Sequence, residues 1–205
     1  MFLEVFSVNT ERDQISEDIL KSIVFGLTGK NASGKGTVAE ILKKKNFTYH
    51  SLSDSLRDEL KTLKKEETRE NLIDIGNKLR EKGGPGVLAD KLIPKLNSEN
   101  NHIVDSIRNP LEVILLRKET LLHRFFLISI DADSRLRYDR LCSRGRTGDT
   151  DSWEKFVEQE KKEENNDDPN KQQLSRTMEM ADYNIDNSGT LEDLEAQVNR
   201  IISSL

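Results

Sequence analysis

The stretch that most constrains the fold is residues 23–42, IVFGLTGKNASGKGTVAEIL, in which an apolar run breaks into glycines and then resumes with helical spacing. This pattern predicts a buried strand over residues 23–28, a tight loop over 29–36 and a helix from Thr37 onward. The loop contains the motif G-x-x-x-x-G-K, and its position between a strand and a helix is typical of a phosphate-binding loop.

A polyphosphate explains why these residue types occur together. Backbone N–H groups must converge on anionic oxygens, which requires glycines where a Cβ would block the approach, and the start of a helix adds partial positive charge. Lys35 supplies a point charge, and each charge-assisted hydrogen bond contributes about 1.5–3 kcal/mol. The residues expected to bind the phosphates are Gly29, Asn31, Ala32, Ser33, Gly34, Lys35, Gly36 and Thr37. The alternative is a glycine-rich turn that binds nothing.

The residue after the lysine departs from the usual motif. It is Gly36 rather than serine or threonine, and the hydroxyl comes one position later, at Thr37. We therefore expect Thr37 to contact a phosphate and the magnesium ion to be held mostly through water.

Composition narrows the class of protein. The 205 residues are enough for one domain with a full core. A net charge of −5 argues against a general nucleic-acid or membrane-surface binder. Cys142 is the sole cysteine, so an internal disulfide is excluded, and we expect a soluble protein of the reducing cytoplasm with no membrane partner.

Further along the chain, strand and helix patterns alternate. Together with the first, the expected strands are 23–28, 47–52, 102–105, 124–130 and 182–186. This alternation predicts an α/β fold with a five-stranded parallel sheet between two helical layers, with ligands beyond the carboxyl ends of the strands. Residues 1–22 are interpreted as an N-terminal extension and 23–205 as the domain.

Three helical patterns fill residues 53–97, between the second and third strands. We interpret them as a substrate-binding insertion, with plain core helices as the alternative. Ser53 is expected to cap the first helix, Asp54 lies in its first turn and Arg57 follows one turn later. Thr68 is expected to cap the second helix.

The third strand ends on Asp105, and Arg108 follows three residues on. Asn109 is expected to cap the next helix, with Pro110 at its first position. A carboxylate at the carboxyl end of a parallel strand is a candidate to orient magnesium-bound water. Arg108 is expected to face the same crevice.

Arginines recur after the fourth strand. Arg137, Arg140 and Arg144 follow helical spacing, and Arg146 lies in a glycine-flanked segment. The row suits a lid, over about residues 137–177, that closes on a triphosphate. The alternative is a solvated face paired with Asp133 and Asp139. Residues 158–177 are expected to form a helix followed by a mobile loop.

These residues resemble the P-loop nucleoside monophosphate kinase superfamily. GxxxxGKGT is similar to the loop of adenylate kinases, and SLSDSLRDEL and VDSIRNPLE resemble the segments after their second and third strands. The resemblance implies that Arg57 and Arg108 bind the acceptor phosphate, that Asp105 serves the magnesium-water shell and that Glu112 lies near the acceptor base. It also implies that Arg140, Arg144 and Arg146 are lid arginines.

Two subfamilies compete for the finer match. GLTG and ADYNIDNSGTLEDLEAQV resemble dephospho-CoA kinase, which implies that Asn187, Ser188 and Gly189 border the adenine of ATP. The middle of the chain resembles the adenylate-kinase-related nucleotide kinases of archaea and the kinase-like segment of some deoxycytidylate deaminases.

The resulting expectation is an ATP- and magnesium-dependent kinase acting on a nucleoside monophosphate or similar small phosphorylated acceptor. Lys35, Asp105, Arg108 and Arg144 are its expected catalytic residues, and Asp54, Arg57, Arg108 and Glu112 its acceptor-binding residues. Dephospho-CoA kinase is the alternative within this chemistry. An ATPase or nucleotide-dependent switch acting on a protein or RNA is the alternative of another class. One cysteine and three histidines disfavour a zinc-bound lid.

Overall fold

The computed structural model describes residues 22–118, 123–145, 152–164 and 168–205. Its strands are β1 (Ser22–Gly29), β2 (Thr48–Ser51), β3 (His102–Asp105), β4 (His123–Asp131) and β5 (Tyr183–Asp186). Its α-helices are α2 (Lys35–Lys43), α3 (Asp54–Thr62), α4 (Arg69–Gly83), α5 (Val87–Leu92), α6 (Pro110–Lys118), α7 (Ser134–Arg144), α8 (Trp153–Glu164), α9 (Leu174–Glu179) and α10 (Leu191–Ser203). A 3-10 turn, η1, spans Ile93–Lys95.

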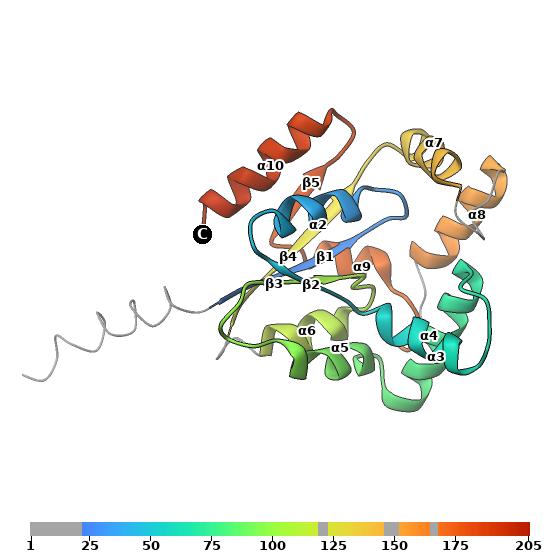
Figure 1. Cartoon of the computed structure of the whole chain (residues 1–205). Coiled ribbons are helices and arrows are strands. Elements are labelled where there is room, and N and C mark those ends of the chain that lie inside the picture. The colour runs from blue at the N-terminus through green and yellow to red at the C-terminus, as the bar shows by residue number, and fades with distance from the viewer. Residues whose placement is uncertain (1–21, 119–122, 146–151, 165–167) are drawn as a thin grey trace, which may run out of the picture.

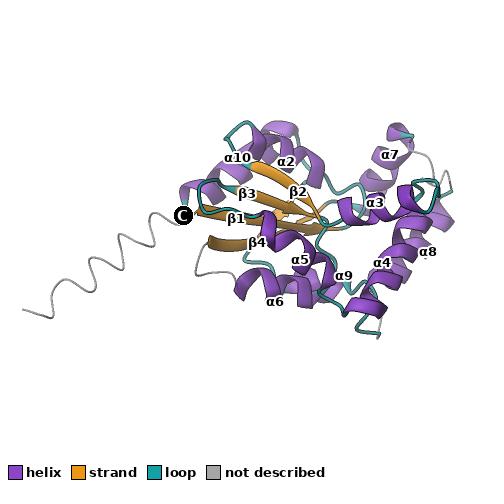
Figure 2. Cartoon of the chain, turned by 60° about the horizontal axis from the view of Figure 1, so that its bottom comes forward, coloured by secondary structure: helices purple, strands orange, loops and turns teal. Residues whose placement is uncertain are grey.

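The strands of this described part form one parallel sheet in the order β2-β3-β1-β4-β5. Helices α2 and α10 cover one face, and α5, α6 and α9 lie on the other (Figures 1 and 2). The predicted α/β fold, with a five-stranded parallel sheet between helical layers, is confirmed.

Alternation along the central strands explains the two cores. Val24 and Leu127 point to the face covered by α5 and α6, whereas Phe25 and Ile128 point to the face covered by α2 and α10. All four side chains are at most 1% exposed. Because both faces of β1 and β4 are buried, their sequences read as apolar runs rather than as alternating polar and apolar residues.

Several element boundaries differ from those expected. Helix α2 begins at Lys35, two residues earlier than predicted, so Gly36 and Thr37 lie in its first turn. Helix α8 begins at Trp153 rather than near residue 158, and the short helix α9 was not predicted. Residues 1–21 lie outside the described residues, as do 165–167 within the expected mobile loop.

Two predicted helix caps are confirmed and one is wrong. The Thr68 side chain accepts a hydrogen bond from Asn71 N, and the Asn109 side chain accepts one from Leu111 N. Ser53 precedes α3 but makes no side-chain cap, because its own backbone is already helical. Its N–H instead donates to Ser51 Oγ at 3.2 Å.

Gly29 is predicted to be essential for stability. Its φ is +140°, and a Cβ there would lie 2.0 Å from the backbone oxygen of Ile130 on the neighbouring strand. Gly29→Ala should lower the free energy of unfolding by about 2–5 kcal/mol, because positive-φ strain adds to a backbone clash. Urea denaturation measures the change, with Gly36→Ala as control because a Cβ at Gly36 meets nothing within 4 Å. Equal unfolding midpoints for the two variants would contradict this reading.

None of the helices in the described ranges combines the length and the apolar content that a membrane span requires.

Candidate functional site

The turn between β1 and α2 has the geometry of an anion-binding loop. Ala32 and Gly34 have positive φ angles of 57° and 103°, so the backbone turns sharply before α2 begins. No side chain caps α2, and the first turn of any helix presents backbone N–H groups that lack intrahelical acceptors. Lys35 Nζ lies 2.7 Å from the carbonyl oxygens of both Gly29 and Lys30. The loop therefore presents N–H groups and an ammonium group together.

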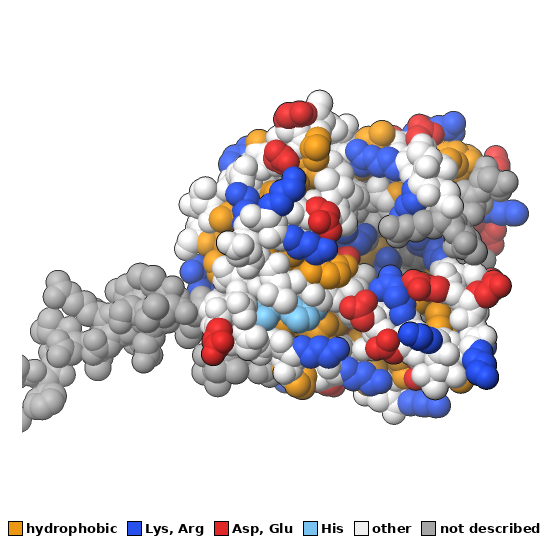
Figure 3. Space-filling view, in the orientation of Figure 1, with side chains coloured by type: hydrophobic (Ala, Val, Ile, Leu, Met, Phe, Trp, Pro, Cys, Tyr) orange, Lys and Arg blue, Asp and Glu red, His pale blue; other side chains and the backbone are white. Residues whose placement is uncertain are grey.

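A cleft with a volume of about 1080 Å³ opens in front of this loop, and Lys and Arg side chains gather around the hollow in Figure 3. The basic residues that line it are Lys35, Arg57, Arg69, Arg80, Arg108, Arg140 and Arg144. The acidic ones are Glu67 and Asp105. Since the whole chain carries a net charge of −5, this concentration of positive charge is local and favours a polyanionic ligand.

Asp105 ends β3 inside this cleft, 8% exposed. One of its carboxylate oxygens accepts a hydrogen bond from Tyr49 Oη at 3.0 Å, and the other accepts from Ser106 N at 2.6 Å. Burial and the neighbouring Asp105 carboxylate raise the pKa of the Tyr49 hydroxyl, so it stays a donor to Asp105 at neutral pH. Asp105 is thus a carboxylate held in place by two hydrogen bonds, in the cleft that the phosphate loop also lines.

The donor set fits a magnesium–nucleotide complex. The hydroxyl of Thr37 and the carboxylate of Asp105 line the same cleft as the loop, and oxygen ligands are those that Mg²⁺ prefers. Ser33 Oγ is buried with no hydrogen-bond partner among the described residues, which leaves one more loop oxygen uncommitted. Thr37 and Asp105 would hold the ion, which when bound would neutralise phosphate charge.

Arg57, on α3, also lines the cleft. It pairs with Asp54 at 3.0 Å and with Glu67 at 2.6 Å. Burial alone would lower the pKa of Arg57, but these two carboxylates outweigh it and raise the pKa. Asp54 was expected to bind the acceptor; instead it does not line the cleft, and its carboxylate holds the Arg57 guanidinium.

Arg108 is positioned by its backbone. Its N–H donates to Glu112 Oε2 at 2.8 Å, and its carbonyl accepts from Gln173 N at 3.0 Å. Its side chain lines the cleft, as expected. The structure thus brings Lys35, Asp105 and Arg108 to one cleft, which Arg57 also lines.

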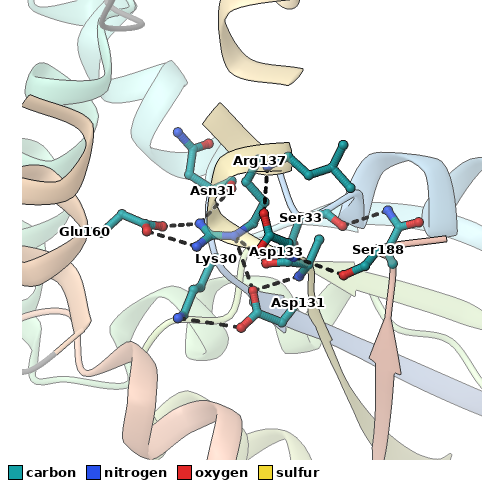
Figure 4. A network of polar contacts seen from close by, with 12 residues as sticks. Lys30, Asn31, Ser33, Asp131, Asp133, Arg137, Glu160 and Ser188 are labelled. Atoms are coloured by element: carbon teal, nitrogen blue, oxygen red, sulfur yellow. Dashed lines mark hydrogen bonds and ion pairs between the residues drawn. The ribbon is translucent and has the colours of Figure 1, made fainter. Parts of the chain in front are cut away.

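The predicted arginine row divides into two groups. Arg137 is 1% exposed and forms a bidentate pair with Glu160 of α8, and its Nε donates to the Ala132 carbonyl at 2.9 Å (Figure 4). Its Nη1 also reaches the Asn31 carbonyl at 3.4 Å. Arg137 was expected either to reach the phosphates as part of the lid or to lie on a solvated face. It does neither, because its side chain is buried against Glu160 and the Ala132 carbonyl. It connects the phosphate loop to α8.

Arg140 and Arg144 line the cleft as expected. Arg140 Nη2 donates to the Asn187 carbonyl at 2.9 Å, and Arg144 Nη2 lies 3.4 Å from Asn31 Oδ1. Arg146 lies outside the described residues.

The loop after β5 contacts the phosphate loop through one side chain. Asn187 Nδ2 donates to the Ser33 carbonyl at 2.8 Å, and a Cβ on Gly34 would lie 2.1 Å from that nitrogen. Gly34 is therefore required for the close approach of Asn187. Ser188 hydrogen-bonds Asp186 and Asp133. None of the three residues expected to border the adenine, Asn187, Ser188 and Gly189, lines the cleft.

Glu112 is not placed as expected. It is fully buried and absent from the cleft lining; Oε1 accepts from Arg80, while Oε2 accepts from the N–H groups of Arg108 and Asn109. Arg80, on α4, is a cleft residue that sequence reasoning missed, because it looks like a solvated charge among the polar residues of that helix. The only sign of its burial in the sequence was the spacing between Arg80 and the apolar residues of α4.

Comparisons with known sequences show the family of this chain. A family model described as an AAA domain matches residues 26–168. The UPF0200 protein of Pyrococcus furiosus is 33% identical over 183 residues, which cover 87% of this chain and 95% of that protein.

Solved structures show the same fold. A Thermus thermophilus protein, TT1252, has a TM-score of 0.54 and 22% identity, covering 90% of this chain and 98% of that one. A gluconokinase from Sinorhizobium meliloti has a TM-score of 0.51 and 14% identity, covering 90% and 95%.

The fold and the phosphate-loop motif thus define an α/β protein of the P-loop class. Within that class the chain belongs to the AAA domain family and to the UPF0200 family.

Proposed function

We propose that this protein transfers the γ-phosphoryl group of ATP to a nucleoside monophosphate or a similar small phosphorylated acceptor. The observation that carries the proposal is that Arg57 and Arg108 lie in the same cleft as the phosphate loop. A pure ATPase or switch needs cations for one polyphosphate, whereas a kinase of phosphorylated acceptors needs a second set for the acceptor.

The roles follow from position. The loop N–H groups and Lys35 would bind the β- and γ-phosphates, and Arg140 and Arg144 would approach them from α7. Arg57 and Arg108 would hold the acceptor phosphate so that its oxygen lies in line with the γ-phosphorus. Bound Mg²⁺ would neutralise part of the negative charge of the phosphates. The helices α3 to α5 would form the acceptor-binding insertion, and α7 with the following segment would form the lid.

Arg108 is predicted to distinguish transfer to an acceptor from hydrolysis. Arg108→Ala should lower kcat/KM for the acceptor by about 100-fold, because it removes a charge-assisted contact from the reacting phosphate, and should leave ATP binding within about twofold. Coupled assays would measure turnover at fixed ATP and magnesium across nucleoside monophosphates, dephospho-CoA and a blank. Arg200→Ala is the matched control, since Arg200 is exposed on α10, away from the cleft.

The acceptor panel also separates the rival functions. Turnover with dephospho-CoA and with none of the nucleoside monophosphates would favour dephospho-CoA kinase. That reading draws on the contact between Asn187 and the phosphate loop, in the segment that resembles that enzyme. The contrary result is a rate of ATP hydrolysis that is the same with every acceptor and in Arg108→Ala. That result would reject the kinase proposal in favour of an ATPase or nucleotide-dependent switch.

A further inference from the structure

Arg80 occupies an unusual position in the cleft wall. The side chain is 2% exposed, and its Nε and Nη2 donate to Glu112 Oε1 at 3.3 and 2.8 Å. Its third nitrogen, Nη1, is buried and has no hydrogen-bond partner among the described residues. A buried guanidinium donor left unpaired is costly, so a position that keeps one calls for an explanation.

Helix α4 makes room for this nitrogen. A Cβ on Gly76, one turn before Arg80, would lie 3.2 Å from Nη1 and 3.6 Å from Leu56 Cδ1. The unpaired donor therefore lies near Leu56 of α3, and both Arg80 and Leu56 line the cleft. The leucine and isoleucine side chains that line the same cleft are Leu52, Leu56, Leu72, Ile73 and Leu88.

A second unpaired atom lies in the cleft wall. Gln172 Oε1 is buried and has no hydrogen-bond partner within the described part of the chain. Its neighbours fix it beside Arg108: the Lys171 carbonyl accepts from Asn109 Nδ2 at 3.0 Å, and Gln173 N donates to the Arg108 carbonyl at 3.0 Å. Glu112, which holds Arg80, accepts from the N–H groups of the same two residues, Arg108 and Asn109.

The cleft thus offers apolar walls, one buried donor and one buried acceptor beside the expected acceptor-phosphate arginine. Apolar walls suit the faces of a flat ring, whereas a sugar would place hydroxyl groups against leucines. We propose that Arg80 Nη1 and Gln172 Oε1 are specificity-determining groups that read the edge of a planar nitrogen heterocycle. The acceptor is then a nucleoside phosphate rather than a phosphorylated sugar. This inference rests on the proposed function in one respect: it takes the acceptor to lie in this cleft, with its phosphate at Arg108.

The test measures binding rather than turnover. Calorimetry on the full chain would compare a panel of nucleoside monophosphates with ribose 5-phosphate, which carries the phosphate but no ring. The wild type should bind at least one nucleotide about tenfold or more tightly than ribose 5-phosphate. Arg80→Lys, which keeps a positive charge beside Glu112, should reduce that preference by about 10- to 100-fold, the contribution of one charge-assisted hydrogen bond. Affinity for ribose 5-phosphate should change less than twofold.

Two further variants keep the result interpretable. Gln172→Leu removes the other edge contact without touching the buried ion pair, so it decides the question if Arg80→Lys fails to fold. Lys78→Met is the control on α4, since Lys78 is exposed, does not line the cleft and pairs with Asp74 at 2.9 Å. Equal losses for nucleotides and ribose 5-phosphate, or a wild type without nucleotide preference, would overturn the inference.

The same data separate this inference from the proposed function. Preferential nucleotide binding that both variants weaken, in a protein that transfers no phosphoryl group, would reject the kinase and support the base-reading role. Phosphoryl transfer by a protein that binds nucleotides no more tightly than ribose 5-phosphate would support the kinase and reject the base-reading role.

Discussion

Lys35→Met is expected to lower the rate of phosphoryl transfer by about 100- to 1,000-fold, the loss typical of removing one electrostatic contact that stabilises the transition state. Lys35 Nζ lies against the carbonyl oxygens of the phosphate loop, in the cleft and beside the helix start where a polyphosphate would bind. Steady-state kinetics with ATP would measure the loss, and ATP should no longer raise the melting temperature.

Lys44→Met is the matched control for this charge change. Lys44 follows the other end of helix α2 and does not line the cleft, so its replacement should leave turnover within about twofold. Near-normal turnover of Lys35→Met would reject the assignment of the phosphate loop as the donor site.

Glu112→Ala is expected to lower the free energy of unfolding by about 3–5 kcal/mol, because it leaves the buried guanidinium of Arg80 without its partner. Glu112 is fully buried, and its two oxygens join Arg80 to the backbone of Arg108 and Asn109. Urea denaturation would measure the change.

Asp74→Ala is the control for that experiment, because it breaks an ion pair with Lys78 whose two side chains are 54% and 55% exposed. Such exposed pairs contribute little, so the loss should be far smaller than that of Glu112→Ala. The double variant Arg80→Met/Glu112→Gln should recover much of the stability, since it removes both charges together. If Glu112→Ala were as stable as the wild type but bound acceptor poorly, the original expectation of a base-contacting Glu112 would be restored.

Much of the fold could be predicted because its signals are local. The strand, glycine turn and helix from Ser22 to Lys43 all show in the residue pattern, and the caps at Thr68 and Asn109 depend on neighbours within three residues. Helix α9 was missed because its six residues, LSRTME, bury only Leu174 and Thr177, too few to form a periodic stripe.

The candidate site was harder to predict where a side chain's partner is distant in sequence. Arg137 and Arg140 both belong to one helical row, yet Arg137 turns to Glu160 and Arg140 faces the cleft. Glu112 likewise finds Arg80 across 32 positions. Spacing within one segment cannot indicate such partners, because they depend on how α4, α6, α7 and α8 pack.

The most direct test of the central claim follows the γ-phosphoryl group itself. The wild-type protein would be given ATP labelled at the γ-phosphorus, with magnesium, with and without the nucleoside monophosphate that it binds most tightly. If the loop and Arg108 place donor and acceptor in one cleft, the label should appear in the nucleoside diphosphate. Release as inorganic phosphate should be slow when no acceptor is present. Label recovered only as inorganic phosphate, at a rate independent of every acceptor, would contradict the account.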